Sequence, residues 1–318
     1  MNVDAAVLAD APDPILLTPS RKTNPLAGVL LAAFGAIAFS GKAIIVKLGY
    51  RYGADAVTLL ALRMLVALPF FGLMALWTRR DVGRLRLDAG DRWRVIGLGF
   101  SGYYLASFLD FAGLEYITAT LERLILYLTP TLVLLIGILV FKRRASRRQI
   151  IALLISYVGV AVAFSHDLHI GGSDTALGSL MVVLSALSYS IYLVGSGQLV
   201  ARVGAMRLTA YASSVACLFC IAQFLLTHSF GVLMHLAPDL YWLSVLNGTA
   251  CTVLPVLAVM LAIARIGSAL ASQIGMIGPV STIVMSTLLL GESMGLWQII
   301  GTVLVMSGVF MVTLPKNS

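Results

Sequence analysis

The hydrophobic positions of this chain form long uninterrupted runs, unlike the alternating pattern of strands or the single apolar stripe of surface helices. Ten such runs occur, each about 20 residues long, which suffices for a helix to cross about 30 Å of hydrocarbon. Helices are required because a bilayer offers no water to satisfy exposed backbone groups. The pattern predicts an all-α integral membrane protein with ten transmembrane helices, at residues 25–48, 55–77, 94–116, 118–141, 148–166, 175–200, 206–229, 239–263, 267–290 and 294–314.

Composition favours a membrane protein over a large soluble helical protein. Hydrophobic residues make up 59% and charged residues 11% of the 318 positions, and the mean hydropathy is +0.97. A soluble domain carries about 25% charged residues. The net charge of +8 does not indicate a nucleic-acid partner, because the basic residues lie in short loops between apolar runs. They are interpreted as topology signals and as contacts to the headgroups of membrane lipids.

The distribution of lysine and arginine predicts the direction of the spans. With a cytoplasmic N-terminus, the inside segments hold 17 basic residues and the outside segments hold 3. Both termini of this multi-pass protein are therefore predicted to be cytoplasmic. Residues 1–24 contain three aspartates and three prolines and lack the order of a signal peptide, so a disordered cytoplasmic tail is expected there.

One local pattern occurs twice. FKRRASRRQIIA at 141–152 and LGESMGLWQIIG at 290–301 share Gln-Ile-Ile at an offset of 149 residues. Pro130 and Pro279 stand at the same offset, as do several glycine pairs. Single identities between apolar helices are common, but a proline, a glutamine and glycines in one register indicate a duplication.

The two copies differ in charge, and their direction in the membrane explains the difference. Each half has five spans, so the second copy begins on the opposite side of the membrane. Arg143 then lies inside and its counterpart Glu292 outside, where basic residues are disfavoured. The sequence therefore predicts two inverted-topology five-helix repeats, at 25–166 (spans 1 to 5) and 175–314 (spans 6 to 10). Inverted repeats are a recurring plan of secondary transporters, which work by alternating access.

The repeats resemble the EamA domain of the drug/metabolite transporter superfamily over about residues 25–314. Each repeat has a proline-bearing fourth span, a short turn, a glutamine and a fifth span with Gly-Val. ASQIGMIGPVSTIVMSTLLLGESMGLWQIIGTVLVMSGV is similar to that family's last two spans, including its Gly-Glu turn at 291–292. TLLALRMLVALP is similar to its second span, with the arginine at Arg63, and Lys47 matches a lysine that often ends the first span.

The chain also departs from the family pattern. The family often has Trp-Gly and an Asn in the first span, where this chain has Phe39-Ser40 and Lys42, and the first repeat lacks the Gly-Glu turn. These departures put the subfamily in doubt more than the fold. The resemblance implies a bacterial inner-membrane exporter of amino acids and related metabolites, and the branch that exports aromatic amino acids is the nearest.

Charged side chains inside membrane spans are costly, so they are candidates for function. Lys42, Asp110 and Glu122 fall in the outer half of spans 1, 3 and 4. A lysine and an acid could meet the carboxylate and ammonium of an amino acid, so Lys42 and Asp110 are predicted to bind substrate. Asp110 and Glu122 are candidates for proton coupling, and uncoupled facilitation stays open. The alternatives are a structural Lys42–Asp110 ion pair and a Glu122 that caps span 4 at the interface. Arg63, in span 2, is interpreted as a structural charge that ties helices or contacts headgroups.

Two prolines in the middle of spans predict a cavity. Pro130 and Pro279 each remove a backbone donor and bend the helix, which frees carbonyl groups near the membrane centre. They are predicted hinges, with Tyr127, Gln273 and Met276 facing the cavity one or two turns earlier. Further candidate substrate-binding residues are hydroxyl and aromatic side chains at similar depth: Tyr103, Ser107, Ser190, Tyr192 and Thr252. Such a lining suits an amphipathic organic solute.

The sequence thus predicts a secondary transporter that exports small metabolites, amino acids including aromatic ones among them. The alternatives are uptake, export of toxic organic cations or drugs, a non-transporting membrane protein, and a lipid-modifying enzyme. Catalysis is not expected because no nucleophile with a base, metal cluster or acid pair converges, and no nucleotide-binding loop is present. No cofactor or metal is expected, since Cys217, Cys220 and Cys251 lie in apolar segments and His166 and His169 are too weak a pattern. The oligomeric state stays open.

Overall fold

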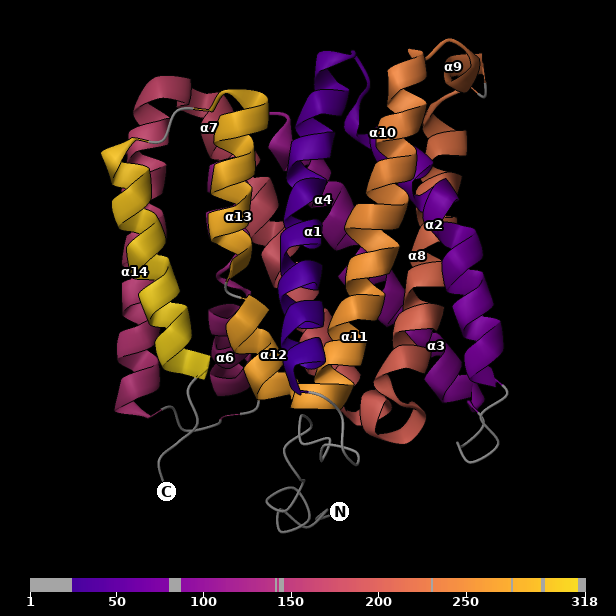
Figure 1. Ribbon diagram of the computed structural model, residues 1–318, viewed down its shortest axis with the longest axis horizontal. Coiled ribbons are helices and arrows are strands. Elements are labelled where there is room, and N and C mark those ends of the chain that lie inside the picture. Colours follow the sequence, from indigo (N-terminus) through magenta and orange to yellow (C-terminus); the bar gives the residue numbers. More distant parts are fainter. Residues whose placement is uncertain are drawn as a thin grey trace.

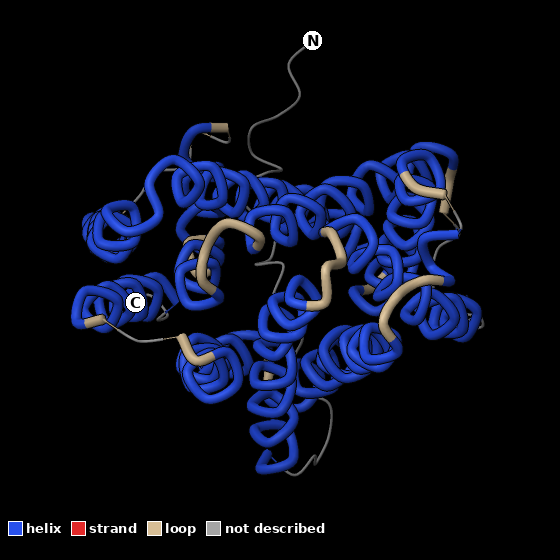
Figure 2. Tube along the Cα trace, turned by 90° about the horizontal axis from the view of Figure 1, so that it is seen from above, coloured by secondary structure: helices blue, strands red, loops and turns tan. Residues whose placement is uncertain are grey.

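The described part of the chain consists of helices joined by short loops and turns. The computed structural model describes residues 25–79, 87–140, 142, 146–229, 231–275, 277–292 and 295–313. No strand occurs in these ranges, which confirms the predicted all-α class (Figures 1 and 2). The predicted tail, residues 1–24, lies outside the described residues.

The helices stand side by side in one bundle, with α1 near its centre (Figure 1). The first half contributes α1 (Pro25–Arg51), α2 (Ala56–Arg79), α3 (Ala89–Gly99), the π-helix η1 (Phe100–Leu105), α4 (Ala106–Leu114), α5 (Ala119–Leu126) and α6 (Thr129–Leu139). The long element α7 (Arg147–Val203) joins the halves and reverses at Gly172, whose φ is 58°. The second half contributes α8 (Ala205–Thr227), α9 (Gly231–Met234), α10 (Pro238–Gly248), η2 (Thr249–Val253), α11 (Leu254–Ile266), α12 (Ser268–Gly275), α13 (Ile277–Met285), η3 (Ser286–Leu290) and α14 (Leu296–Thr313).

Eight of the described helical segments are long and apolar enough to cross a membrane. They are Leu26–Arg51, Ala56–Arg79, Ala89–Leu114, Ala119–Leu139, Arg147–Phe164, Gly172–Gly197, Ala205–Thr227 and Pro238–Ile266. The predicted spans 267–290 and 294–314 instead contain shorter apolar helices, Ile277–Leu290 and Leu296–Met311. The beginning of α1 and the end of α14 lie at the same end of the bundle (Figure 1).

Apolar side chains cover the outside of the bundle while small polar ones lie within it. Leu226 and Leu288 are 86% and 76% exposed, whereas Ser156 and Ser190 are fully buried. A protein in water could not expose so many large apolar residues without aggregating. In a bilayer this distribution is favourable, because lipid tails cover the apolar side chains.

The fourth predicted span is broken close to its proline. Helix α5 ends at Leu126 and α6 begins at Thr129, with Pro130 in its first turn. Proline cannot donate to the carbonyl group four residues earlier, and its ring collides with that group. The hydroxyl of Thr129 takes over this role by donating to the carbonyl oxygen of Leu126 at 2.6 Å.

The ninth predicted span is described in two parts, α12 up to Gly275 and α13 from Ile277, with Met276 between them outside the described residues. Pro279 is buried within α13. Of the two predicted hinge prolines, Pro130 lies just after a break in its helix.

Two glycines allow close helix contacts that match at the repeat offset. A Cβ atom at Gly99 would lie 2.7 Å from the carbonyl oxygen of Ala212, and one at Gly248 would lie 2.8 Å from that of Arg63. Gly99 precedes η1 and Gly248 precedes η2. Gly248 lies 149 positions after Gly99, and Ala212 lies 149 positions after Arg63. Each half therefore contacts the other through the same local design.

The contact at Gly99 leads to a testable prediction. Gly99→Ala is expected to destabilise the protein by about 1–3 kcal/mol, because a buried backbone oxygen occupies the place of the new methyl group. Gly97→Ala is the matched control, since nothing lies within 4 Å of its Cβ position on the same helix. Thermal unfolding of the purified proteins in detergent measures the difference. Equal unfolding midpoints for the two variants would contradict the close approach of α3 and α8.

Candidate functional site

A cavity of about 420 Å³ lies among α1, α2, η1, α4, the α5–α6 break, α7, α8 and α11. Six of the predicted substrate-binding residues line it: Lys42, Tyr103, Ser107, Asp110, Tyr127 and Thr252. Arg63 and the hinge residue Pro130 line it too, while Pro279 is not part of its described wall. Both halves of the chain therefore contribute to one central space.

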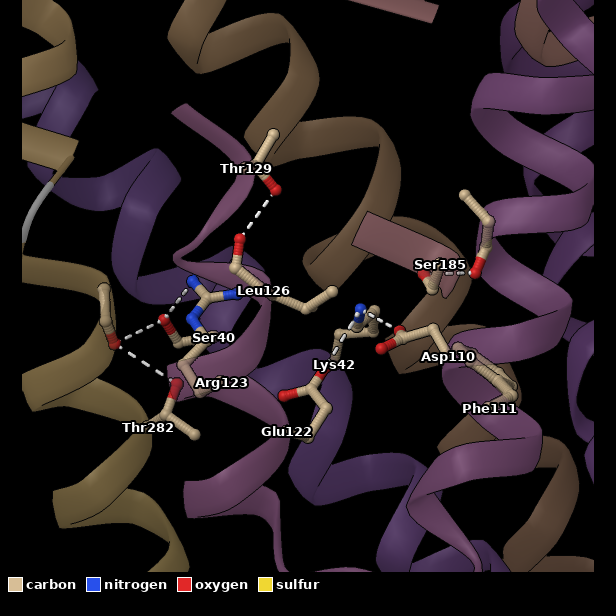
Figure 3. A network of polar contacts seen from close by, with 12 residues as sticks. Ser40, Lys42, Asp110, Phe111, Glu122, Arg123, Leu126, Thr129, Ser185 and Thr282 are labelled. Carbon is tan, nitrogen blue, oxygen red and sulfur yellow. Dashed lines mark hydrogen bonds and ion pairs between the residues drawn. The ribbon is translucent and has the colours of Figure 1, made fainter. Parts of the chain in front are cut away.

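The centre of the site is a buried charge triad formed by Lys42, Asp110 and Glu122 (Figure 3). Nζ of Lys42 donates a hydrogen bond to Oδ2 of Asp110 and lies 3.5 Å from Oε1 of Glu122. All three side chains are buried, and Glu122 is 0% exposed. One ammonium group thus faces two carboxylate groups, which leaves one negative charge unbalanced within the triad.

The position of Glu122 differs from the interfacial cap considered as an alternative. Thr118 is the N-cap residue of α5, and its Oγ1 accepts a hydrogen bond from the backbone NH of Leu121 at 3.1 Å. Glu122 lies one turn further along α5, deep in the bundle and beside Lys42. Because Glu122 is buried beside Lys42, it remains a candidate for proton coupling.

Arg63 connects two helices from opposite halves. Its Nε donates to Oγ1 of Thr252 in η2 at 2.8 Å, and its guanidinium lies over the ring of Phe111 at 5.2 Å from the centroid. The side chain is only 5% exposed, and Nη1 has no hydrogen-bond partner among the described residues. Arg63 therefore ties α2 to η2 while one of its donor groups stays unused.

A second arginine in the cavity wall, Arg123, is absent from the sequence-based candidates. The charge count places it in the outer loop, but the structure places it at the cavity, where Nη2 donates to Oγ of Ser40 at 3.0 Å (Figure 3). Ser40 in turn lies 2.8 Å from the carbonyl oxygen of Gly278. Nε of Arg123 is buried without a hydrogen-bond partner in the described part of the chain. Its position within predicted span 4 was the available signal, since a cation inside a span is costly.

Tyrosine rings form one side of the site. The hydroxyl groups of Tyr103 and Tyr192 are 3.2 Å apart, and the ring of Tyr189 stacks on that of Tyr192 with centroids at 5.7 Å. Tyr103 and Tyr189 line the cavity, whereas Tyr192 packs behind them against Gly102. Tyr189 therefore lines the cavity in place of the predicted Tyr192.

Other predicted residues have different surroundings. Ser190 lies outside the cavity wall, and its hydroxyl donates to the carbonyl oxygen of Ala186 in its own helix at 2.7 Å. The hydroxyl of Tyr127 donates to the carbonyl oxygen of Gly275 at 2.8 Å, which links the fourth and ninth predicted spans. The side chain of Gln273 and the whole of Met276 lie outside the described residues.

Glu292 joins the halves at the end of the bundle where α5 begins. The preceding Gly291 adopts φ 71° and ends η3, a left-handed conformation that favours glycine. The carboxylate of Glu292 then accepts hydrogen bonds from the backbone NH groups of Ala119 and Thr120, at 3.0 and 3.4 Å. A negative charge at a helix N-terminus is stabilising. These contacts give a physical reason for the Gly-Glu turn noted in the sequence.

Glu292→Ala is accordingly expected to lower the free energy of unfolding by about 1–2 kcal/mol, the range for loss of a helix cap. Asp239→Ala is the matched control, because Asp239 is an exposed acid in the first turn of α10 that makes no capping hydrogen bond. Chemical or thermal unfolding in detergent provides the measurement. A loss of similar size in both variants would show that the cross-helix contact contributes nothing specific.

Metal-ligand groups do not converge in the described part of the chain. No set of three His, Cys, Asp or Glu residues there is arranged to hold a metal ion. Cys217, Cys220 and Cys251 are unpaired and buried, and Sγ of Cys217 packs 3.7 Å from Sδ of Met64. The Cys-x-x-Cys spacing therefore serves packing between α8 and α2.

An apolar helical bundle with a polar, charged and aromatic cavity at the junction of its two halves defines a multi-pass membrane protein of the transporter class. Comparison with known families agrees: the model of the EamA-like transporter family matches residues 26–165 and again residues 176–314. The chain belongs to the EamA-like transporter family.

Individual relatives agree with this assignment. An uncharacterized transporter of Bacillus subtilis, YcbK, is 32% identical over 304 residues, which cover 92% of this chain and 93% of the relative. An uncharacterized transporter of Archaeoglobus fulgidus is 25% identical over 91% of this chain and 98% of its own length. A solved crystal structure superposes with a TM-score of 0.59 at 16% identity, covering 90% of this chain and 96% of that one, and supports the fold alone. Family and relatives point to transport and not to catalysis.

Proposed function

We propose that the protein exports small metabolites, in particular amino acids including aromatic ones, from the cytoplasm by alternating access. The observation that carries the proposal is the central cavity, with Asp110 and Lys42 beside the ring of Tyr103. Ligand sites for organic solutes are largely apolar and contain a few polar anchors. Oδ1 of Asp110 is buried without a hydrogen-bond donor among the described residues, so it can accept one from a substrate ammonium group.

The proposed arrangement has ten spans in two inverted repeats, with both termini in the cytoplasm and the protein in a bacterial inner membrane. The bias of 17 basic residues to 3 supports this direction. Paired contacts support the inversion: Ser40 lies 2.8 Å from the carbonyl oxygen of Gly278, and Ser190 lies 3.4 Å from that of Thr129. These partners correspond at offsets of 150 and 149, so span 1 contacts span 9 as span 6 contacts span 4.

The proposed hinges for the alternating motion are Pro130, just after the break in its helix, and Pro279, its counterpart in the second repeat. The hydrogen bond from Tyr127 to the carbonyl oxygen of Gly275 joins the two proline-bearing spans. A change of angle at Pro130 and Pro279 would open one end of the cavity while the other closes. Broken helices at a central site are a recurring feature of secondary transporters.

Proton coupling is proposed to occur at the charge triad. One lysine cannot neutralise two buried carboxylate groups, so the triad has room for one proton. Glu122 is the proposed carrier, because Asp110 already accepts the hydrogen bond of Lys42. A substrate ammonium group at Asp110 would compete with that proton, which gives exchange of substrate for protons.

Counterflow in proteoliposomes tests the proposed function. Vesicles loaded with unlabelled phenylalanine should accumulate labelled phenylalanine transiently, and vesicles without protein should not. A lipophilic cation serves as the competing substrate class, and the wall, with Lys42, Arg63 and Arg123 against one acid, disfavours it. Counterflow of the cation with none of any amino acid would overturn amino-acid export in favour of cation export.

A further inference from the structure

Two arginines line the cavity, Arg63 buried and Arg123 half-buried, and no carboxylate of the described residues pairs with either guanidinium group. Arg63 donates only to Thr252, and Arg123 donates only to Ser40 among the described residues. No Asp or Glu of the described chain lies within ion-pair distance of either group. Lys42, by contrast, already has two carboxylate neighbours.

Each arginine also has an N–H group without a partner. Nη1 of Arg63 and Nε of Arg123 are both buried and unpaired in the described part of the chain, and both side chains line the same cavity. A buried unpaired donor on a charged group is destabilising, and moving such an ion out of water costs several kcal/mol. Positions of this kind persist where a ligand supplies the missing acceptor.

The wall of the cavity is consequently rich in positive charge. Lys42, Arg63 and Arg123 line it against the single acid Asp110, while Glu122 lies behind the wall beside Lys42. Because Lys42 is paired with Asp110, the positive charge left in the wall for a solute is that of the two arginines. Arginine suits this role because its N–H groups match the geometry of a carboxylate.

We propose that Arg63 and Arg123 are the carboxylate-binding residues of the substrate site. This inference rests on the proposed export of amino acids and deepens it, since it names the group that every substrate must carry. The substrate carboxylate binds the free N–H groups of the two arginines, and Lys42 remains the counterion of Asp110. The substrate class is organic acids with an apolar or aromatic body, and a primary amine is an additional feature read by Asp110.

Three phenyl ligands of similar size separate the contribution of the carboxylate from that of the ammonium group. Phenylalanine carries a carboxylate and an ammonium group, 3-phenylpropanoate carries the carboxylate alone, and phenethylamine carries the ammonium alone. Binding to the purified full-length protein in detergent is measured by calorimetry, independently of transport. The wild type is expected to bind both acids at least about tenfold more tightly than phenethylamine, the difference expected from charge-assisted hydrogen bonds.

Variants of the two arginines test whether these residues bind the carboxylate of the ligand. Arg63→Met and Arg123→Met are each expected to raise the Kd of both acids about tenfold or more and to change that of phenethylamine less than about twofold. Arg63→Lys and Arg123→Lys should recover part of the affinity, because the charge is kept. Arg92→Met, which removes an exposed arginine of α3, is the matched control and should leave every Kd unchanged.

The outcomes discriminate between the two proposals. Wild-type protein that binds 3-phenylpropanoate no better than phenethylamine overturns the carboxylate site, and so do arginine variants that weaken all three ligands equally. Should the methionine variants fail to fold, the same comparison is decided with the lysine variants. Absence of amino-acid counterflow would instead overturn the proposed function, and binding of acids through the two arginines would still stand.

Discussion

Lys42→Met is expected to destabilise the protein by about 3–5 kcal/mol, the cost of removing one partner from a buried ion pair. The substitution leaves Asp110 and Glu122 buried beside each other without their shared cation. Neither Oδ1 of Asp110 nor either oxygen of Glu122 has another hydrogen-bond donor among the described residues. Thermal unfolding in detergent measures the loss, and counterflow of phenylalanine should disappear with it.

A charge-matched series separates this effect from loss of packing. Asp110→Asn should cost less than Lys42→Met, because Lys42 then keeps Glu122 as its counterion. The double variant Lys42→Met/Asp110→Asn should be more stable than Lys42→Met alone, since one of the two unpaired acids is gone. Lys142→Met, at an exposed lysine, is the control and should unfold like the wild type. A double variant no more stable than Lys42→Met would show that the triad is not an electrostatic unit.

Span positions could be predicted because hydropathy is a local property. The segment around Lys42 and the segment around Arg63 are helices where the sequence predicted them. For 267–290, Met276 lies outside the described residues, and the part from Ile277 to Leu290 is a shorter apolar helix. Proline indicates a bend, but the sequence alone does not say whether the helix bends or stops.

Which face of a span points inward was harder to predict, because it depends on the register of each helix. The π-helix η1, Phe100–Leu105, adds a residue to one turn of the third span. One extra residue rotates everything beyond it by about 100° in an α-helix. Tyr103 and Asp110, seven residues apart, share one helix face and both line the cavity. The insertion changes how this face is oriented relative to the residues before Phe100, which the sequence alone did not indicate.

Contacts between residues that are distant in sequence were hard to predict, although a Lys42–Asp110 ion pair was among the alternatives. The charges of Lys42, Asp110 and Glu122 could be listed as costly, but their meeting at one point depends on the packing of three helices. Arg123 illustrates the limit most clearly. Its contact with Ser40 forms only because α5 lies beside α1, and no local pattern around residue 123 indicates that neighbour.

Glu122→Gln is expected to abolish proton-driven accumulation while exchange of substrate continues. The amide has nearly the shape of the acid but cannot take up and release a proton, so the triad would keep one fixed charge state. A pH gradient of one unit corresponds to a tenfold concentration ratio for exchange of one proton. Proteoliposomes with wild-type protein should therefore accumulate phenylalanine about tenfold, and those with the variant should only reach equal concentrations.

The measurement needs both modes of transport in the same vesicles. Counterflow without a pH gradient should proceed in Glu122→Gln at a rate within about twofold of the wild type, because exchange does not require a proton to move. Glu115→Gln makes the same chemical change at an exposed position and should keep both activities. Tenfold accumulation by Glu122→Gln would exclude Glu122 as the carrier and leave Asp110 as the coupling candidate. Because Glu122 lies behind the cavity wall and against Lys42, its protonation can alter the charge that a substrate meets without contact between them.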